Sequence, residues 1–172
     1  TQAIADRNPA NDRTKASVAV MNIYDSELPW PEGTEIKALR VVQLFPKTTR
    51  KAAVPKIGAG DQSLARGVLG TVPVEKDGSA FFEAPAGIPF YLQALDDKGM
   101  AVQTMRSLTY VHRGEKMQCQ GCHETKQQAA VNAFPVTPIA LKRAPSKLEP
   151  DVDGSWPLTF PRLVQPVLDK KC

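Results

Sequence analysis

The sequence predicts a mainly β protein in which a small antiparallel β-sandwich is followed by a short, partly helical segment. Apolar runs of strand length recur roughly every 8–12 residues with turn residues between them, as is typical of sandwiches. The chain has fifteen prolines and eleven glycines, and proline favours short strands and ordered loops over long helices. Hydrophobic residues make up 42% of the chain and charged residues 23%, which allows a modest core and argues against global disorder.

The first part of the chain contains two expected strands. Residues 1–16 are polar and are expected to form a linker or arm. Residues 17–24 are a mostly apolar run of strand length, and a second such run at residues 36–45 is closed by Pro46. The basic segment 47–65 that follows is expected to be a long loop.

The clearest local signal is a hairpin turn at Asp77-Gly78. Asp-Gly is a preferred pair in tight turns because glycine adopts a positive φ without a steric cost. The runs on either side, residues 69–75 and 79–84, are therefore expected to pair as neighbouring strands.

A second hairpin is expected further along the chain. Residues 90–95 and 100–110 are two more strand-like runs, and the turn between them contains Asp96 and Gly99. Together these strands define a sandwich of the transthyretin or immunoglobulin kind over residues 17–112.

The character of the sequence changes after Gly114. Residues 113–145 are expected to form a separate segment with a short helix at residues 125–133. Residues 146–172 are interrupted by prolines and are expected to link to a further domain. The chain begins with Thr1 rather than methionine and stops at a cysteine, so we expect a fragment, and it contains neither a signal peptide nor a transmembrane run.

The net charge of +4 is mildly basic, and one stretch of the chain concentrates it. Seven basic residues occur from Lys37 to Arg66, with Asp61 as the only acidic interruption. Such a run could dock an acidic redox partner, but a solvated loop and strand edge is the favoured interpretation. No nucleic-acid-binding module surrounds these residues, so we expect no nucleic-acid partner.

Two of the three cysteines form the motif Cys119-Gln-Gly-Cys122-His123. This spacing is typical of covalent c-type haem attachment. Two thiols about one helical turn apart can each add to a vinyl group of one porphyrin, and histidine is the usual iron ligand. Gly121 has no Cβ and leaves room for the macrocycle against the backbone. We therefore expect haem c as cofactor, with Cys119 and Cys122 as thioether anchors and His123 on the iron.

Three other interpretations of the motif are weaker. A structural zinc site needs four ligands, and the chain offers only Cys119, Cys122, His123 and the distant His112. A thioredoxin-like redox pair expects a βαβ context, which this strand-rich sequence lacks. A simple disulfide would suit an exported protein but leaves the histidine unexplained.

The sixth position of the iron has several candidates. His112 lies seven residues before Cys119, a stretch that spans roughly 23 Å when extended, so it could reach the other face of the porphyrin. Met100, Met105 and Met117 are thioether alternatives, and methionine opposite histidine raises the reduction potential. Met117 is too close to Cys119 to cross the ring. The sequence favours an open or externally filled site over any one of them.

Cys172 is the odd cysteine, and the segment Phe160-Pro-Arg-Leu-Val-Gln-Pro-Val-Leu-Asp-Lys-Lys-Cys172 precedes it. Cytochrome segments often end in this way just before a haem motif. We therefore interpret Cys172 as the first cysteine of a second haem c site, in a truncated cytochrome c domain that residues 146–172 lead into.

Two stretches carry a family resemblance. One is residues 65–87, ARGVLGTVPVEKDGSAFFEAPAG, and the other is residues 93–107, QALDDKGMAVQTMRS, which leads through Gly114-Glu115 into the motif CQGCHE. Over residues 17–140 they resemble the middle domain of the hydrazine synthase α-subunit family. The resemblance implies a β-rich domain feeding a haem-binding segment, with a β-propeller before it and a further c-type haem domain after it in the parent chain.

The sequence departs from that family in one respect. In hydrazine synthase the haem at this position takes a tyrosine shortly after the motif as iron ligand, and the motif histidine binds zinc. Here every tyrosine lies upstream of the motif, at Tyr24, Tyr91 and Tyr110, and Gln127 stands four residues after His123. We therefore expect His123 to be an ordinary proximal iron ligand.

Three functions are compatible with the sequence. The first is electron transfer by the haem-binding segment of an exported multidomain c-type cytochrome, in the periplasm or an equivalent compartment. Its partners would be other domains of the parent chain, namely a propeller and a cytochrome c domain, and a redox protein. The second is a catalytic haem site in a hydrazine-synthase-like oxidoreductase. The third is a sandwich that serves as an interaction or spacer module.

Overall fold

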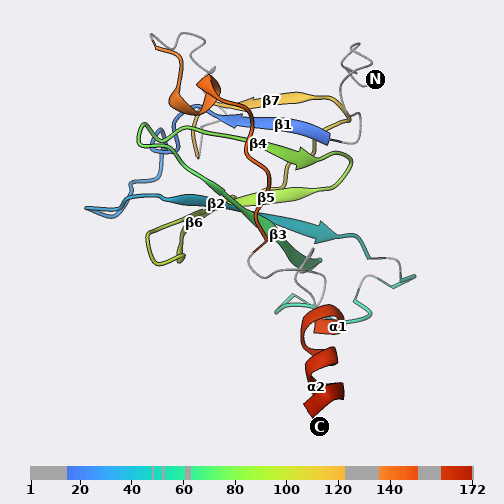
Figure 1. Ribbon diagram of the computed structural model, residues 1–172. Coiled ribbons are helices and arrows are strands. Elements are labelled where there is room, and N and C mark those ends of the chain that lie inside the picture. The colour runs from blue at the N-terminus through green and yellow to red at the C-terminus, as the bar shows by residue number, and fades with distance from the viewer. Residues whose placement is uncertain are drawn as a thin grey trace.

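A computed structural model describes residues 15–47, 49–51, 53–60, 63–122, 136–150 and 160–171, and these residues form two β-sheets that lie face to face (Figure 1). One sheet has three strands in the order β4-β1-β7, and the other has four in the order β3-β2-β5-β6. The three-stranded sheet consists of β1 (Lys15–Val20), β4 (Ala80–Pro85) and β7 (Lys116–Cys119). The four-stranded sheet consists of β2 (Ala38–Phe45), β3 (Ala65–Pro73), β5 (Phe90–Leu95) and β6 (Ala101–Thr104). The prediction of a mainly β protein is therefore confirmed.

The core lies between the sheets because apolar side chains alternate along the strands. In β4, Ala80, Phe82 and Ala84 are buried while the residues between them are partly exposed, as expected for a strand with one inward face. The core joins residues of both sheets: Val18, Val20, Phe82, Leu39, Val41, Leu69, Val72, Phe90, Leu92 and Ala94.

The Asp77-Gly78 turn forms as predicted, but the hairpin does not. Gly78 has φ +79°, and the backbone N–H of Glu75 donates to the Ser79 carbonyl at 2.8 Å. However, β3 joins the four-stranded sheet while β4 pairs with β1 in the other sheet. The prediction that these two strands pair is therefore wrong. Asp77 and Gly78 determine the turn between the strands, but they do not determine which sheet each strand joins.

The second predicted hairpin is confirmed, although its second strand is the four-residue β6 and not the whole of residues 100–110. β5 and β6 pair antiparallel, and Gly99 takes φ +73° in the turn between them. The Asp96 carboxylate stabilises this turn by accepting from the backbone N–H groups of Lys98 and Met100 at 2.9 and 2.8 Å.

β7 departs from the antiparallel sandwich that the sequence predicts, because it runs parallel to β1. Ser17 lies opposite Lys116, and Val20 lies opposite Cys119. The three-stranded sheet therefore extends past residue 112, where we expected the strands to end. This pairing carries the first motif cysteine onto the sheet.

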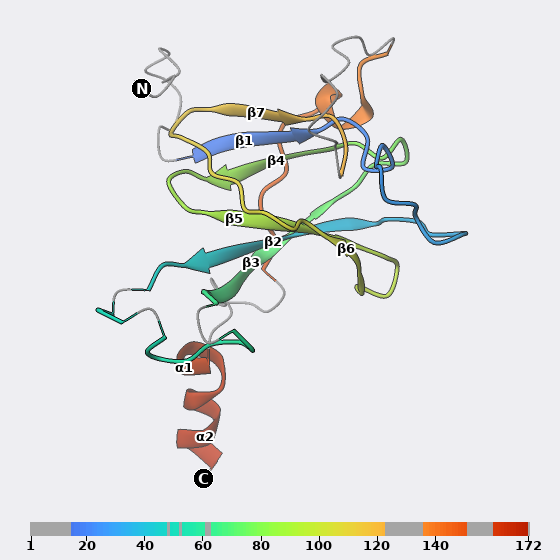
Figure 2. The same ribbon diagram turned by 180° about the vertical axis from the view of Figure 1, so that it is seen from behind.

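The chain crosses back over the sheets as a strap, defined as residues 138–149 and visible in both views (Figures 1 and 2). It begins with the 3-10 helix η1 (Ile139–Lys142), whose amides donate to the Asp77 carboxylate at 2.8 Å and to the buried Ser79 hydroxyl at 3.0 Å. Further along, Ser146 forms a bridge with β4. The strap thus covers the edge of the three-stranded sheet that β4 forms.

The strap then reaches β3, which is one of the two edge strands of the four-stranded sheet. Thr71 of β3 and Glu149 exchange two backbone hydrogen bonds of 2.8 and 3.0 Å. Gly70 permits this approach, because it has φ +148° and a Cβ there would lie 2.6 Å from the Glu149 carbonyl oxygen. One segment therefore binds the edge strands of both sheets.

Two short helices follow, α1 (Phe160–Leu163) and α2 (Gln165–Lys171). No helix in the described part of the chain is long and apolar enough to cross a membrane. The helix predicted at residues 125–133 lies outside the described residues, as do His123 and Cys172.

Candidate haem-attachment site

The motif begins on a strand. Cys119 is the last residue of β7, and its carbonyl accepts a hydrogen bond from the backbone N–H of Met21 at 2.9 Å. The chain then bends through Gly121 and Cys122. Cys119 is therefore held by a sheet and Cys122 by the bend that follows it, whereas the sequence had suggested the spacing of a helical turn.

The loop after β1 holds the motif in place through Asp25. The Asp25 carbonyl accepts from the backbone N–H of Cys122 at 3.0 Å, and the Asp25 carboxylate accepts from the Gln120 side-chain amide at 2.9 Å. Asn22 adds a third contact, because its N–H donates to the Gln120 carbonyl at 3.0 Å. A Cβ at Gly121 would overlap the Asp25 carbonyl oxygen, so only glycine fits at this position.

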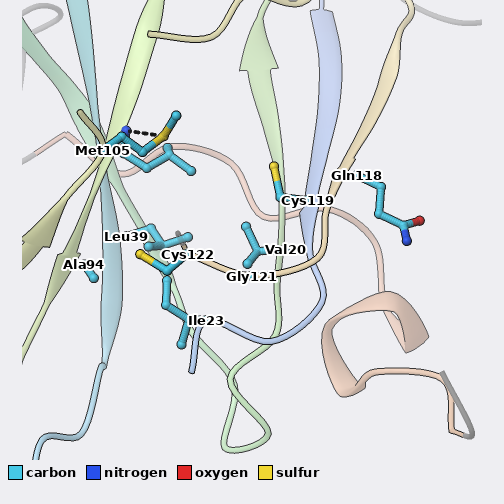
Figure 3. Close-up of a pocket in the computed structure, with 10 residues that line it drawn as sticks. Val20, Ile23, Leu39, Ala94, Met105, Gln118, Cys119, Gly121 and Cys122 are labelled. Atoms are coloured by element: carbon cyan, nitrogen blue, oxygen red, sulfur yellow. Dashed lines mark hydrogen bonds between the residues drawn. The ribbon is translucent and has the colours of Figure 1, made fainter. Parts of the chain in front are cut away.

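Both motif cysteines line one cavity between the two sheets, with a volume of about 240 Å³ (Figure 3). Its other walls are mostly apolar: Val20, Ile23, Leu39, Leu92, Ala94, Met105, Gln118 and Gly121. The volume is below the roughly 300–1,000 Å³ of pockets that enclose a drug-sized ligand. A porphyrin attached here would therefore be buried only in part.

Neither of the two thiols forms a disulfide, and both are partly buried. In Figure 3 their sulfurs point in different directions, and Cys122 points toward the four-stranded sheet. Burial raises the pKa of the Cys122 thiol to about 11, and the neighbouring Cys119 adds to this effect. Cys122 is therefore a neutral thiol at physiological pH.

This raised pKa predicts slow alkylation of Cys122 in the protein without haem. Because the thiolate is the nucleophile, a pKa of about 11 in place of 9.0 lowers its reactive fraction about 100-fold at neutral pH. Iodoacetamide labelling between pH 7 and 10, followed by mass spectrometry, should give a Cys122 rate that rises about tenfold per pH unit throughout. A peptide of residues 117–126 is the control, and its rate should level off near pH 9. A Cys122 rate that also levels off near pH 9 would contradict the burial effect.

The side chains present fit covalent haem attachment in their chemistry, because two thiols of the correct spacing, neither of them in a disulfide, line one mostly apolar cavity. Within the described residues, no group of three or more His, Cys, Asp or Glu side chains is arranged to hold a metal ion. His123, the expected iron ligand, and Cys172 lie outside those residues.

The candidates for the sixth iron position differ in whether they line the cavity that holds the two cysteines. Met105 lines the cavity with the two cysteines. His112 packs edge-on against Tyr110 with ring centroids 5.2 Å apart and does not line the cavity. Met100 is 65% exposed in the β5–β6 turn, and Met117 accepts a hydrogen bond from Thr109 through its sulfur at 3.4 Å.

Sequence reasoning did not find Asp25 as part of the site. Its main contribution is a backbone carbonyl, and no residue pattern reveals which carbonyl a distant loop will meet. Gly121 was the one available signal of this contact. A glycine can mark a position where another part of the backbone approaches closely, as the Asp25 carbonyl does here.

The chain is similar in sequence and in fold to known proteins. A family model described as the hydrazine synthase alpha subunit middle domain matches residues 34–124. A curated relative, hydrazine synthase subunit alpha of Kuenenia stuttgartiensis, is 33% identical over 103 residues, which cover 52% of this chain and 13% of that protein. The solved structure of Kuenenia stuttgartiensis hydrazine synthase matches with a TM-score of 0.59 and 26% identity, over 76% of this chain and 20% of that chain. The chain thus spans about an eighth of the curated relative.

Proposed function

Because this chain belongs to the hydrazine synthase alpha subunit middle-domain family, we propose that it is the haem-binding segment of a larger, exported c-type cytochrome and transfers electrons within it. The observation that carries the proposal is the cavity onto which both motif thiols open. The family match also extends through the motif, as it ends at residue 124. The periplasm or an equivalent compartment is the proposed location, and other domains of the parent chain are the proposed partners.

Each described residue of the site has a definite part in this proposal. Cys119 and Cys122 would hold the haem: each thiol would add across one vinyl group, its sulfur to one carbon and its hydrogen to the other, so the addition would need no oxidant. His123 would bind the iron. The bound haem supplies one-electron exchange at that iron. Asp25 keeps the motif loop against the sheet, while the apolar walls exclude water from one side of the site.

Production of the chain beside a haem-maturation system tests the proposal. We expect covalent haem in the unaltered protein, detected by the mass of the denatured chain and by its visible spectrum. The Cys119→Ser and Cys122→Ser variants should each keep at most one thioether bond, and the double variant should keep none. Cys172→Ser is the matched control and should retain the haem of the unaltered protein. Covalent haem in the double variant would refute attachment at the motif.

A catalytic haem is the second candidate, because the curated relative bears the name hydrazine synthase. The two functions differ in the coordination of the iron. Electron transfer requires a low-spin, six-coordinate iron, whereas catalysis requires an open position and a high-spin spectrum that shifts with small nitrogen ligands. The spectrum of the haem-loaded protein therefore separates them.

A further inference from the structure

The cavity between the two sheets has walls that suit an uncharged guest. Six of its ten lining residues are aliphatic residues or methionine: Val20, Ile23, Leu39, Leu92, Ala94 and Met105. Among the described residues, no lysine, arginine, histidine, aspartate or glutamate lines it. A charged molecule would therefore lose its hydration in this cavity without gaining a charged partner, which costs free energy.

The two motif thiols do not make the cavity polar. Both are partly buried, and burial raises the pKa of the Cys122 thiol to about 11, so this side chain carries no charge at neutral pH. A neutral cysteine behaves as a small hydrophobic side chain with a weak S–H donor. The thiols thus add to the apolar wall.

Water finds few partners in this cavity. Gln118 is the one lining residue with an amide side chain, but it precedes Cys119 in β7, so the two side chains lie on opposite faces of the strand. In Figure 3 the Gln118 amide points away from the three sulfurs. A buried water needs two to four polar partners, and an apolar cavity without them takes up apolar molecules instead.

The volume of the cavity limits the size of the guest. At about 240 Å³ it is larger than a dry cavity of roughly 150 Å³ that takes up benzene or xenon. It is smaller than the roughly 300–1,000 Å³ of pockets for drug-sized ligands. One aromatic ring with a small substituent is therefore the kind of molecule that this space can enclose.

We propose that the cavity is a binding site for a small, uncharged, apolar molecule about the size of one substituted aromatic ring. This inference goes beyond the proposed function and does not depend on it, because it concerns the chain without haem. The bound ring would contact Met105, and a thioether sulfur beside an aromatic ring is a favourable contact. It would also cover Cys119 and Cys122, since their side chains line the same space.

Toluene binding to the full haem-free chain tests the proposal. With methyl-labelled methionine, the Met105 signal should shift and saturate as toluene is added, because the ring current acts on a methyl group in the same cavity. Met100 and Met117 do not line the cavity, and their signals should stay in place. Benzoate and benzylammonium carry the same ring with a charge, and they should bind on the order of tenfold more weakly or worse.

A variant that fills the cavity gives a second measurement. Ala94 lies in β5 and is buried in the cavity wall, so Ala94→Leu should weaken toluene binding on the order of tenfold or more by occupying the space. Ala101→Leu is the matched control, because Ala101 is exposed in β6 and lies outside the cavity. It should bind toluene like the unaltered protein.

Protection of Cys122 needs no variant. In the unaltered protein, toluene at ten times its Kd should slow iodoacetamide labelling of Cys122 about tenfold, since only the toluene-free molecules react. The peptide of residues 117–126 should react at the same rate with and without toluene.

Three results would overturn the proposal. The first is a Met105 signal that does not shift, or shifts no more than that of Met100. The second is equal toluene binding by folded Ala94→Leu and Ala101→Leu. The third is a Cys122 labelling rate that toluene leaves unchanged. None of these results affects the haem yield of the matured chain, so failure of this proposal and failure of the proposed function are distinguishable.

Discussion

A Gly121→Ala variant is expected to unfold more readily than the unaltered protein and to carry much less covalent haem. The added Cβ would overlap the Asp25 carbonyl oxygen, which also accepts the Cys122 N–H, so the loop and the motif have to separate. Overpacking of this kind typically lowers the free energy of unfolding by about 1–3 kcal/mol. A clash with a backbone atom is at the upper end of this range, because a side chain can move to another rotamer and a backbone carbonyl cannot. Cys122 would then lose its fixed place beside Cys119.

Urea unfolding of the haem-free protein and the haem yield measure the two effects. Gly60→Ala is the matched control, because a Cβ at Gly60 meets nothing within 4 Å. It should change neither the unfolding midpoint nor the haem yield. If Gly121→Ala matched Gly60→Ala in both measurements, the contact between Asp25 and the motif would not hold in solution.

A Phe82→Ala variant is expected to lose about 3–5 kcal/mol of unfolding free energy. Phe82 and Phe90 are the largest fully buried side chains among the described residues, and Phe82, with 0% exposure, lies in β4 against the core between the sheets. Its removal leaves a cavity that the surrounding strands can fill only in part. For a domain of this size such a loss is a large part of the total stability.

Phe81→Ala is the control for this prediction. Phe81 is the preceding residue of β4, is only partly buried, and does not belong to the core cluster. Its loss should cost clearly less in the same urea titration. Equal costs for Phe81 and Phe82 would mean that the inward face of β4 is assigned incorrectly.

Local chemistry explains which parts of this fold the sequence could predict. The strand Phe90–Leu95 and the following turn were predicted correctly, because Asp96 and Gly99 specify that turn through their own backbone and side chain. The Asp77-Gly78 turn was also found. Its strands were assigned to the wrong partners, since a turn determines a reversal of direction and not a pairing.

Long-range backbone contacts explain what the sequence missed. β7 has four residues, Lys116–Cys119, which are too few for a periodic pattern, and its partner β1 lies about a hundred positions earlier. The strap binds β3 and β4 largely through backbone groups, which every sequence carries. For the site, the motif gave the two anchors, but only the fold shows that Met105 shares their cavity.

The strap also determines how far the chain can be shortened before it tends to aggregate. A chain cut at residue 124, where the family match ends, would leave the outer edges of β3 and β4 without a partner. Bare strand edges recruit strands from other molecules, so such a fragment would tend to aggregate. The two edges that the strap leaves uncovered, β6 and β7, are only four residues long each, and short edges are less prone to this association. The segment after the motif therefore protects the protein from self-association.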